Sequence, residues 1–181
     1  MSSVRPFRLA DASIRLDSMP VAGREAHVAP SADERAAVAD AVGVTTVDAL
    51  DVKLLAVRFR GGMRVTGRLT ASVTQPSVVT LEPIRQDISE PIDRVFLPGG
   101  EKDFAGPANA EIFVDLEGDD VPDHFEGNEA DLTDLIVETL ALAVDLYPRA
   151  PGESLDALGL KQEGVEDHPF AALKALKPKE E

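Results

Sequence analysis

The stretch VDALDVKLLAVRFRGGMRVTGRLTASVTQPSVV, residues 47–79, decides the fold of this 181-residue chain. Two runs rich in β-branched residues, 47–60 and 63–79, flank the dipeptide Gly61-Gly62. Glycine pairs between such runs mark the turns of β-hairpins. The stretch therefore predicts two long antiparallel strands, and an antiparallel sheet as the framework of the protein.

The register of this hairpin is predicted from the residues that must share a face. Leu55, Val57 and Phe59 alternate with Ala56 and two arginines in the first strand. A half-buried strand turns its apolar residues to one face. A loop of three residues, 61–63, pairs Phe59 with Val65 and gathers the apolar residues of both strands, whereas a two-residue loop mixes the faces. We therefore expect the three-residue loop, which puts four arginines on the outer face near the hairpin tip: Arg58, Arg60, Arg64 and Arg68.

Two helices are expected beside the hairpin. Ser31 is followed three residues later by Glu34, which is the capping-box pattern of a helix start. It predicts a helix over residues 32–42 that ends at Gly43. Residues 131–146 predict a second, long helix, and its wide apolar stripe indicates deep burial against the sheet.

Further strands are expected at residues 4–9 and 84–97, the latter interrupted by Pro91. Together these elements predict an α+β fold. We expect an antiparallel β-sheet or a partly open barrel-like body, with one short helix and one long buried helix.

The net charge of −15 is unevenly distributed along the chain. Residues 1–98 hold 12 acidic and 12 basic residues, whereas residues 99–135 hold 12 acidic residues and one basic residue, a net charge of −11. The total charge argues against a protein that coats nucleic acid with its whole surface, but it allows a local basic patch. The expected organisation is one domain over 1–148, which includes an acidic loop at 99–130, followed by a flexible linker and a short amphipathic segment over 149–181.

Several classes of site are excluded or disfavoured by composition. The chain has no cysteine, which excludes disulfides, thiolate metal sites and cysteine nucleophiles. Its three histidines are scattered, and no phosphate-binding glycine loop or serine-elbow motif is present. Part of the acidic segment has the spacing of an EF-hand-like calcium loop, but Asp120 stands where that loop needs glycine. We therefore expect no cofactor, no metal and no small-molecule substrate. The sequence shows no converging acid–base pair that would indicate an enzyme.

Two kinds of surface remain as functional candidates. Guanidinium groups on a rigid hairpin are suited to phosphate contacts, so the four arginines are the candidate RNA-binding residues, against the alternative of an ordinary solvated sheet face. The acidic segment and the apolar side of residues 169–177 are the candidate protein-binding surfaces. Their residues are Asp115, Glu117, Asp119, Asp120, Phe170 and Leu173.

The chain resembles a known family in three ordered segments. They are VTQPSVVTLEPIRQDISEPIDRVFLP at 73–98, DLTDLIVE at 131–138 with LALA at 140–143 and YPR at 147–149, and PFAAL at 169–173. This pattern is similar to the bacterial YceD-like family of large ribosomal RNA subunit accumulation proteins. Many members carry a Cys-x-x-Cys pair before the Leu-Glu-Pro, where this chain has Ser77 and Thr80. No metal or redox role is therefore carried over, and we expect these positions to serve a turn between strands.

The resemblance implies a non-enzymatic role in 23S ribosomal RNA accumulation and large ribosomal subunit biogenesis. The expected partner is ribosomal RNA or a large-subunit precursor. The alternative is an acidic adaptor that shields a basic ribosomal protein or assembly factor. The sequence contains no run of about 20 apolar residues that would span a bilayer, so the expected setting is the cytoplasm, without a membrane partner.

Overall fold

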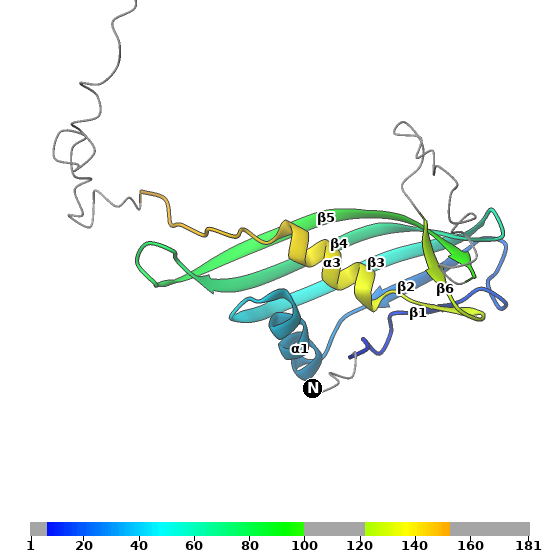
Figure 1. The fold of residues 1–181 in the computed structure, drawn as a ribbon, viewed down its shortest axis with the longest axis horizontal. Coiled ribbons are helices and arrows are strands. Elements are labelled where there is room, and N and C mark those ends of the chain that lie inside the picture. The colour runs from blue at the N-terminus through cyan, green and yellow to red at the C-terminus, as the bar shows by residue number, and fades with distance from the viewer. Residues whose placement is uncertain (1–6, 100–121, 153–181) are drawn as a thin grey trace, which may run out of the picture. The chain divides into compact units, whose positions relative to one another are not determined.

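A five-stranded sheet built around the predicted hairpin is the framework of the protein (Figure 1). The computed structural model describes residues 7–99 and 122–152. Strand order is β2-β3-β4-β5-β6, with β3 antiparallel to β2 and β4, and β5 parallel to β6. A second sheet pairs β1 with β7, and neither sheet closes into a barrel. The strands are β1 (Ser13–Arg15), β2 (Arg24–Val28), β3 (Thr46–Phe59), β4 (Gly62–Pro76), β5 (Pro83–Pro98), β6 (Asp123–Phe125) and β7 (Glu129–Asp131).

The chain divides into two units. The first consists of Met1–Gln75 with Arg85–Leu146, and the second consists of Pro76–Ile84 with Tyr147–Glu181. Among the described residues, both helices and nearly all of the five-stranded sheet belong to the first unit. Most of the expected acidic loop and the expected C-terminal segment lie outside the described residues, and so do all six candidate protein-binding residues.

The hairpin between β3 and β4 is confirmed, but its predicted register is wrong. The loop has two residues, Arg60 and Gly61, and Phe59 pairs with Gly62. Both loop residues have positive φ angles, 49° and 84°, as the tight turns whose twist suits a hairpin require. Arg60 adopts this conformation although it is not a glycine, so the sequence pattern placed the turn one residue too late.

The changed register exchanges the faces of β3 near the hairpin tip. Val52 pairs with Leu69 and Ala56 with Val65, and all four are fully buried. Leu55, predicted to be buried, lies on the other face with a relative exposure of 38%. Apolar residues occur on both faces of this strand, so alternation alone does not identify the face that the core covers.

A β-bulge near the start of β3 adjusts which residues face the core. Val47 pairs with Val73, and Ala49 pairs with Ser72, so Asp48 is the extra residue. The bulge allows Val47 and Leu50 to be buried on the same side although their sequence separation is odd.

Helix α1 (Ala32–Val42) is confirmed with the predicted ends. The Ser31 hydroxyl accepts a hydrogen bond from the Glu34 amide, and the Glu34 carboxylate accepts one from the Ser31 amide. These bonds satisfy amides that have no partner within the helix. Gly43 ends the helix in a left-handed conformation. Val38 and Ala39 are buried, and the helix packs against β3.

Helix α3 (Thr133–Ala143) is shorter and less buried than predicted. Ile136 and Leu140 are fully buried in the core, but Leu142 is 78% exposed. The helix stops because Val144 is extended, and the next amide donates to the Gln86 side chain instead of continuing the helix. The expectation of a long, deeply buried helix is therefore wrong, because only one side of α3 faces the sheet.

The N-terminal strand expected at residues 4–9 is not observed where it can be tested. Residues 4–6 lie outside the described part of the chain, and Phe7–Leu9 form no strand. The first strand is β1, in which Ile14 is fully buried opposite Ala130. The predicted strand at 84–97 is confirmed as β5.

Candidate nucleic-acid interface

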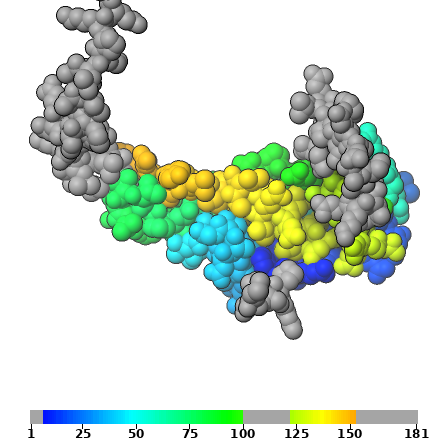
Figure 2. All heavy atoms as spheres, viewed as in Figure 1, coloured from blue at the N-terminus to red at the C-terminus, as the bar shows by residue number. Residues whose placement is uncertain are grey.

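The outer face of the five-stranded sheet is the face turned away from α1 and α3. The two helices contact each other and lie over the opposite face, as Figures 1 and 2 show. Side chains alternate between the two faces of a strand. The outer face therefore carries the odd-numbered residues of β3 from Asp51 to Phe59, paired with the even-numbered residues of β4 from Gly62 to Thr70.

Arg58 does not lie on the outer face. It pairs with Met63, which is fully buried, and this register places Arg58 on the core side of the sheet. Its guanidinium group donates to the backbone carbonyl of Leu16 at 2.8 Å and to that of Met19 at 3.3 Å. Arg58 therefore anchors the segment that connects β1 and β2.

Arg60 and Arg64 are held by neighbouring side chains. Arg60 is in the turn, with its guanidinium carbon 4.9 Å from the centre of the Phe59 ring. Arg64 lies on the outer face and binds Asp93 of β5 through two nitrogens, at 2.7 Å and 2.6 Å. Hydrogen bonding to Arg64 lowers the pKa of the Asp93 carboxyl. The prediction that four arginines share one face is therefore wrong, and only Arg64 and Arg68 lie on the outer face.

A row of basic residues crosses three neighbouring strands on the outer face. It consists of His27 on β2, Lys53 on β3 and Arg68 on β4, and each is the register partner of the next. We call these three residues the basic row. The Lys53 side chain is 76% exposed and that of His27 is 56% exposed. The row presents two cations, Lys53 and Arg68, and the His27 imidazole at a fixed spacing because the strands are hydrogen-bonded to each other.

The contacts of the basic row are few among the described residues. The imidazole of His27 contacts the Asp51 carboxylate, and the Lys53 ammonium lies 4.0 Å from the same carboxylate. Arg68 donates to the Ser89 hydroxyl at 3.1 Å, which is a neutral partner. One carboxylate, Asp51, is therefore shared by two of the three residues.

Sequence reasoning missed His27 and Lys53 because their place depends on register. Lys53 faces Arg68 only in the observed pairing, and the predicted pairing put Leu55 opposite Leu69 instead. His27 belongs to a five-residue strand that the sequence pattern did not predict. The signal available for this strand was the short alternation in which Ala26 and Val28 face the core.

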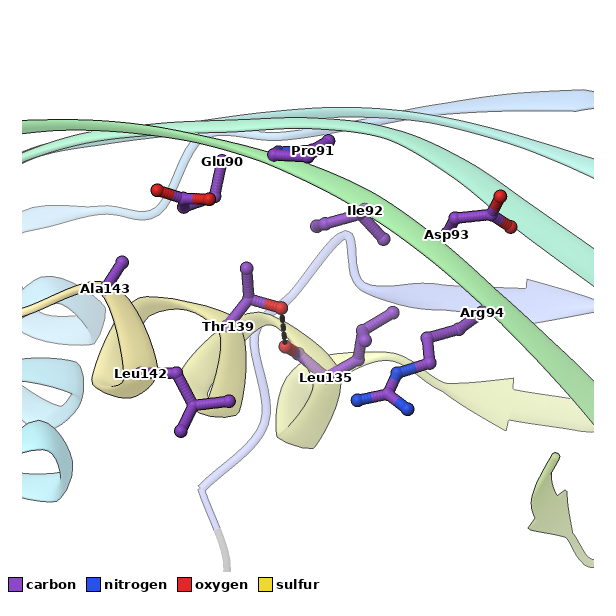
Figure 3. A pocket seen from close by; sticks show the side chains of 9 residues that line it. All are labelled: Glu90, Pro91, Ile92, Asp93, Arg94, Leu135, Thr139, Leu142 and Ala143. Atoms are coloured by element: carbon purple, nitrogen blue, oxygen red, sulfur yellow. Dashed lines mark hydrogen bonds between the residues drawn. The ribbon is translucent and has the colours of Figure 1, made fainter. Parts of the chain in front are cut away.

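A groove of about 350 Å³ runs between β5 and α3 (Figure 3). Its lining is mixed, with Leu135 and Leu142 from the helix and Glu90 and Arg94 from the strand. The Thr139 hydroxyl in the groove donates to the backbone carbonyl of Leu135 at 2.7 Å. The proton of the Thr139 hydroxyl is therefore already used in a hydrogen bond within α3.

Ser77 and Thr80 belong to a turn between β4 and β5. Ser77 is fully buried, and its hydroxyl accepts hydrogen bonds from the amides of Val79 and Thr80 at 3.0 Å and 3.2 Å. The Ser77 amide donates to the Glu82 carbonyl at 2.8 Å. The expected turn role of Ser77 therefore has a specific hydrogen-bonding basis. Leu81 in this turn has a positive φ of 63°.

Two further observations limit the chemistry of the described residues. Within residues 7–99 and 122–152, no cluster of three or more histidine, aspartate or glutamate side chains could hold a metal ion. No helix in this part of the chain is long and apolar enough to cross a membrane.

The described residues define a small α+β protein in which α1 and α3 cover one face of the sheet and the basic row lies on the other. Residues 65–177 match the family described as "Large ribosomal RNA subunit accumulation protein YceD", and the chain belongs to this family. No curated protein and no solved structure matches the chain. Arg68 lies inside the matched region, whereas His27 and Lys53 precede it.

Proposed function

We propose that this protein acts in 23S ribosomal RNA accumulation and large-subunit biogenesis in the cytoplasm, as a factor that catalyses no reaction. In this proposal it contacts ribosomal RNA or a precursor particle through the outer face of its sheet. Membership of the family supports the pathway. The pairing of Lys53 with Arg68 carries the RNA contact.

The repulsion within this pair is the physical reason. Like charges directly opposite each other destabilise an antiparallel pair of strands. Asp51, the carboxylate nearest to Lys53, also contacts His27, and Arg68 has a serine hydroxyl as its partner. A phosphate group between the two cations relieves the repulsion and receives donors from both. Of the four predicted arginines, Arg68 therefore remains as the main phosphate contact. Arg64, four residues away on the same face of β4, is already paired with the Asp93 carboxylate.

The test is the salt dependence of RNA binding. The full-length protein is titrated into a labelled single-stranded fragment of 23S ribosomal RNA at several salt concentrations. Each phosphate contact contributes about −0.7 to the slope of log affinity against log salt. The variant Lys53→Glu/Arg68→Glu removes the one phosphate contact that the two cations share, so the slope becomes shallower by about 0.7.

A control reverses one positive charge elsewhere, which is half of the charge change in the double variant. Arg15→Glu alters an exposed arginine on β1, which pairs with Asp17 at 2.8 Å. It should leave the slope unchanged while the double variant flattens it. Equal slopes for the wild type and the double variant would refute the assignment of the contact to this pair.

The charge of residues 99–135 favours a second candidate function. A net charge of −11 in 37 residues suits an adaptor that shields a basic ribosomal protein or assembly factor. Neutralising four of these residues, Asp115→Asn, Glu117→Gln, Asp119→Asn and Asp120→Asn, should then abolish a pull-down association that survives nuclease treatment. An association that nuclease removes, and that this variant retains, favours the RNA contact instead.

A further inference from the structure

A hollow of about 690 Å³ lies beside the basic row in the sheet formed by β2, β3 and β4. Two cross-strand rows border it. One consists of Glu25, Leu55 and Thr66, and the other consists of His27 and Lys53 of the basic row, with Arg68 next to Lys53 just outside the lining. The volume is within the range of small-molecule sites in proteins, although this hollow is open to solvent on the outer face.

From this arrangement we infer a site for one unpaired nucleotide, which rests on the proposed RNA contact and specifies it. The phosphate binds Lys53 and Arg68 of the basic row, and the base enters the hollow. The argument depends on the apolar surface, the placement of charges and the rigidity of the strands, which are taken in turn.

The hollow offers the surfaces that a base requires. Leu55 is a large apolar side chain exposed on this face, and the imidazole of His27 stands on the opposite border. Bases bind proteins by stacking on apolar or aromatic side chains, histidine included, while their edges form hydrogen bonds. The Thr66 hydroxyl and the Glu25 carboxylate supply polar groups to the same border as Leu55.

The charges on the two borders are opposite and therefore orient a nucleotide. The Lys53 ammonium is on one border, and the Glu25 carboxylate is on the other. A phosphate is attracted to the basic row and repelled by the Glu25 carboxylate. A base that carries an amino group can donate a hydrogen bond to that carboxylate. The site should therefore prefer adenine, cytosine or guanine to uracil, which has no amino group and whose N3–H donor is flanked by two carbonyl oxygens that the carboxylate repels.

The two borders are held at a fixed separation by the strands themselves. Gly67 lies between Thr66 and Arg68 on β4, and a Cβ atom there would be 2.0 Å from the backbone oxygen of Lys53. Only glycine permits this close approach of β3 and β4. A site built on such packed strands is more rigid than a site on loops.

A paired base in a duplex is stacked and cannot enter the hollow. Single-stranded RNA presents bases that can turn outward. We therefore expect binding to oligoadenylate or oligocytidylate to be stronger than binding to oligouridylate of equal length. Binding to a duplex of equal charge should also be weaker than binding to the single strand.

The experiment measures fluorescence anisotropy of short labelled oligoribonucleotides with the full-length protein. Glu25→Gln should remove most of the preference for oligocytidylate over oligouridylate, which we expect to be about fivefold, the low end for a base-specific hydrogen bond. Glu129→Gln, an exposed acidic residue on β7, is the control and should leave the preference intact. Leu55→Ser should weaken binding to all single strands but not to inorganic polyphosphate.

The outcomes separate this inference from the proposed function. Suppose that Lys53→Glu/Arg68→Glu abolishes binding, and that the wild-type protein binds oligouridylate, oligocytidylate and duplex with equal affinity. The nucleotide site is then refuted, and the RNA contact stands. If no oligoribonucleotide binds even at low salt, the RNA contact fails and the nucleotide site fails with it. A base preference that Glu25→Gln removes supports both. Thermal unfolding of each variant checks that the fold is retained.

Discussion

Gly67→Ala should be one of the most damaging single-methyl additions in this protein. The added Cβ atom would lie 2.0 Å from the backbone oxygen of Lys53, 2.9 Å from the Cα atom of Leu54 and 3.0 Å from its Cδ2 atom. The first two atoms belong to backbone, so no side-chain rotation relieves the overlap. The strands must separate by at least 1.0 Å, which is the difference between 2.0 Å and the 3.0 Å limit that real Cβ contacts respect.

The free-energy cost follows from the backbone shift. Overpacking in a core costs about 1–3 kcal/mol. Each β-ladder hydrogen bond weakened by the separation adds about 0.5–1.5 kcal/mol. Alanine has less conformational freedom than glycine in the unfolded chain, and this offsets about 0.4–1 kcal/mol of the destabilisation. We expect a net loss of about 3 kcal/mol, which lowers the melting temperature by roughly 6–12 °C for a protein of this size.

The assay is urea unfolding followed by circular dichroism, with thermal melting as a second measurement. Gly61→Asn is the control, because no atom lies within 4 Å of a Cβ at Gly61 and asparagine tolerates its positive φ. The free energy of unfolding of that control should fall by less than about 1 kcal/mol. The reasoning is refuted if the free energy of unfolding of Gly67→Ala lies within about 0.5 kcal/mol of the wild-type value and the urea slope is unchanged. That result would show that β3 and β4 do not approach each other as closely at Gly67 as the structure indicates.

Three further predictions concern single hydrogen-bonding groups. Ser31→Ala removes the cap that α1 shares with Glu34 and should cost about 1 kcal/mol in urea unfolding; an unchanged midpoint would contradict the capping role. Ser77→Ala leaves two turn amides without their acceptor and should cost about 1–3 kcal/mol by the same measurement, whereas Ser77→Thr, which retains a hydroxyl, should cost less. Asp93→Asn removes a carboxyl whose pKa Arg64 lowers, so its stabilisation is present above about pH 4, the ordinary pKa, and is lost as the pH falls through the lowered value. The exposed pair should contribute less than about 1 kcal/mol to the free energy of unfolding at pH 7. A difference in this free energy between wild type and variant that is as large in strong acid as at pH 7 would contradict the ion pair.

The sequence by itself determined the elements whose signals are local. The capping box of Ser31 and Glu34, with Gly43 at the far end, defined α1 because each signal acts within one or two helical turns. The hairpin around Gly61 and the long strand β5 were also predictable, since alternation and turn residues are local. The family was recognisable from short motifs, and the match over residues 65–177 confirmed it.

Only the tertiary structure decided the register, the extent of α3 and the grouping of basic residues. The Arg60 backbone adopts a left-handed conformation that sequence preference does not favour, and this shifts the pairing of every residue along β4. The core then selects Ala56 rather than Leu55 as the buried neighbour. Lys53 and Arg68 are 15 residues apart in sequence and become adjacent only in this register. Local patterns determine secondary structure, but which residues face each other across strands depends on the turn and on the core that covers one face.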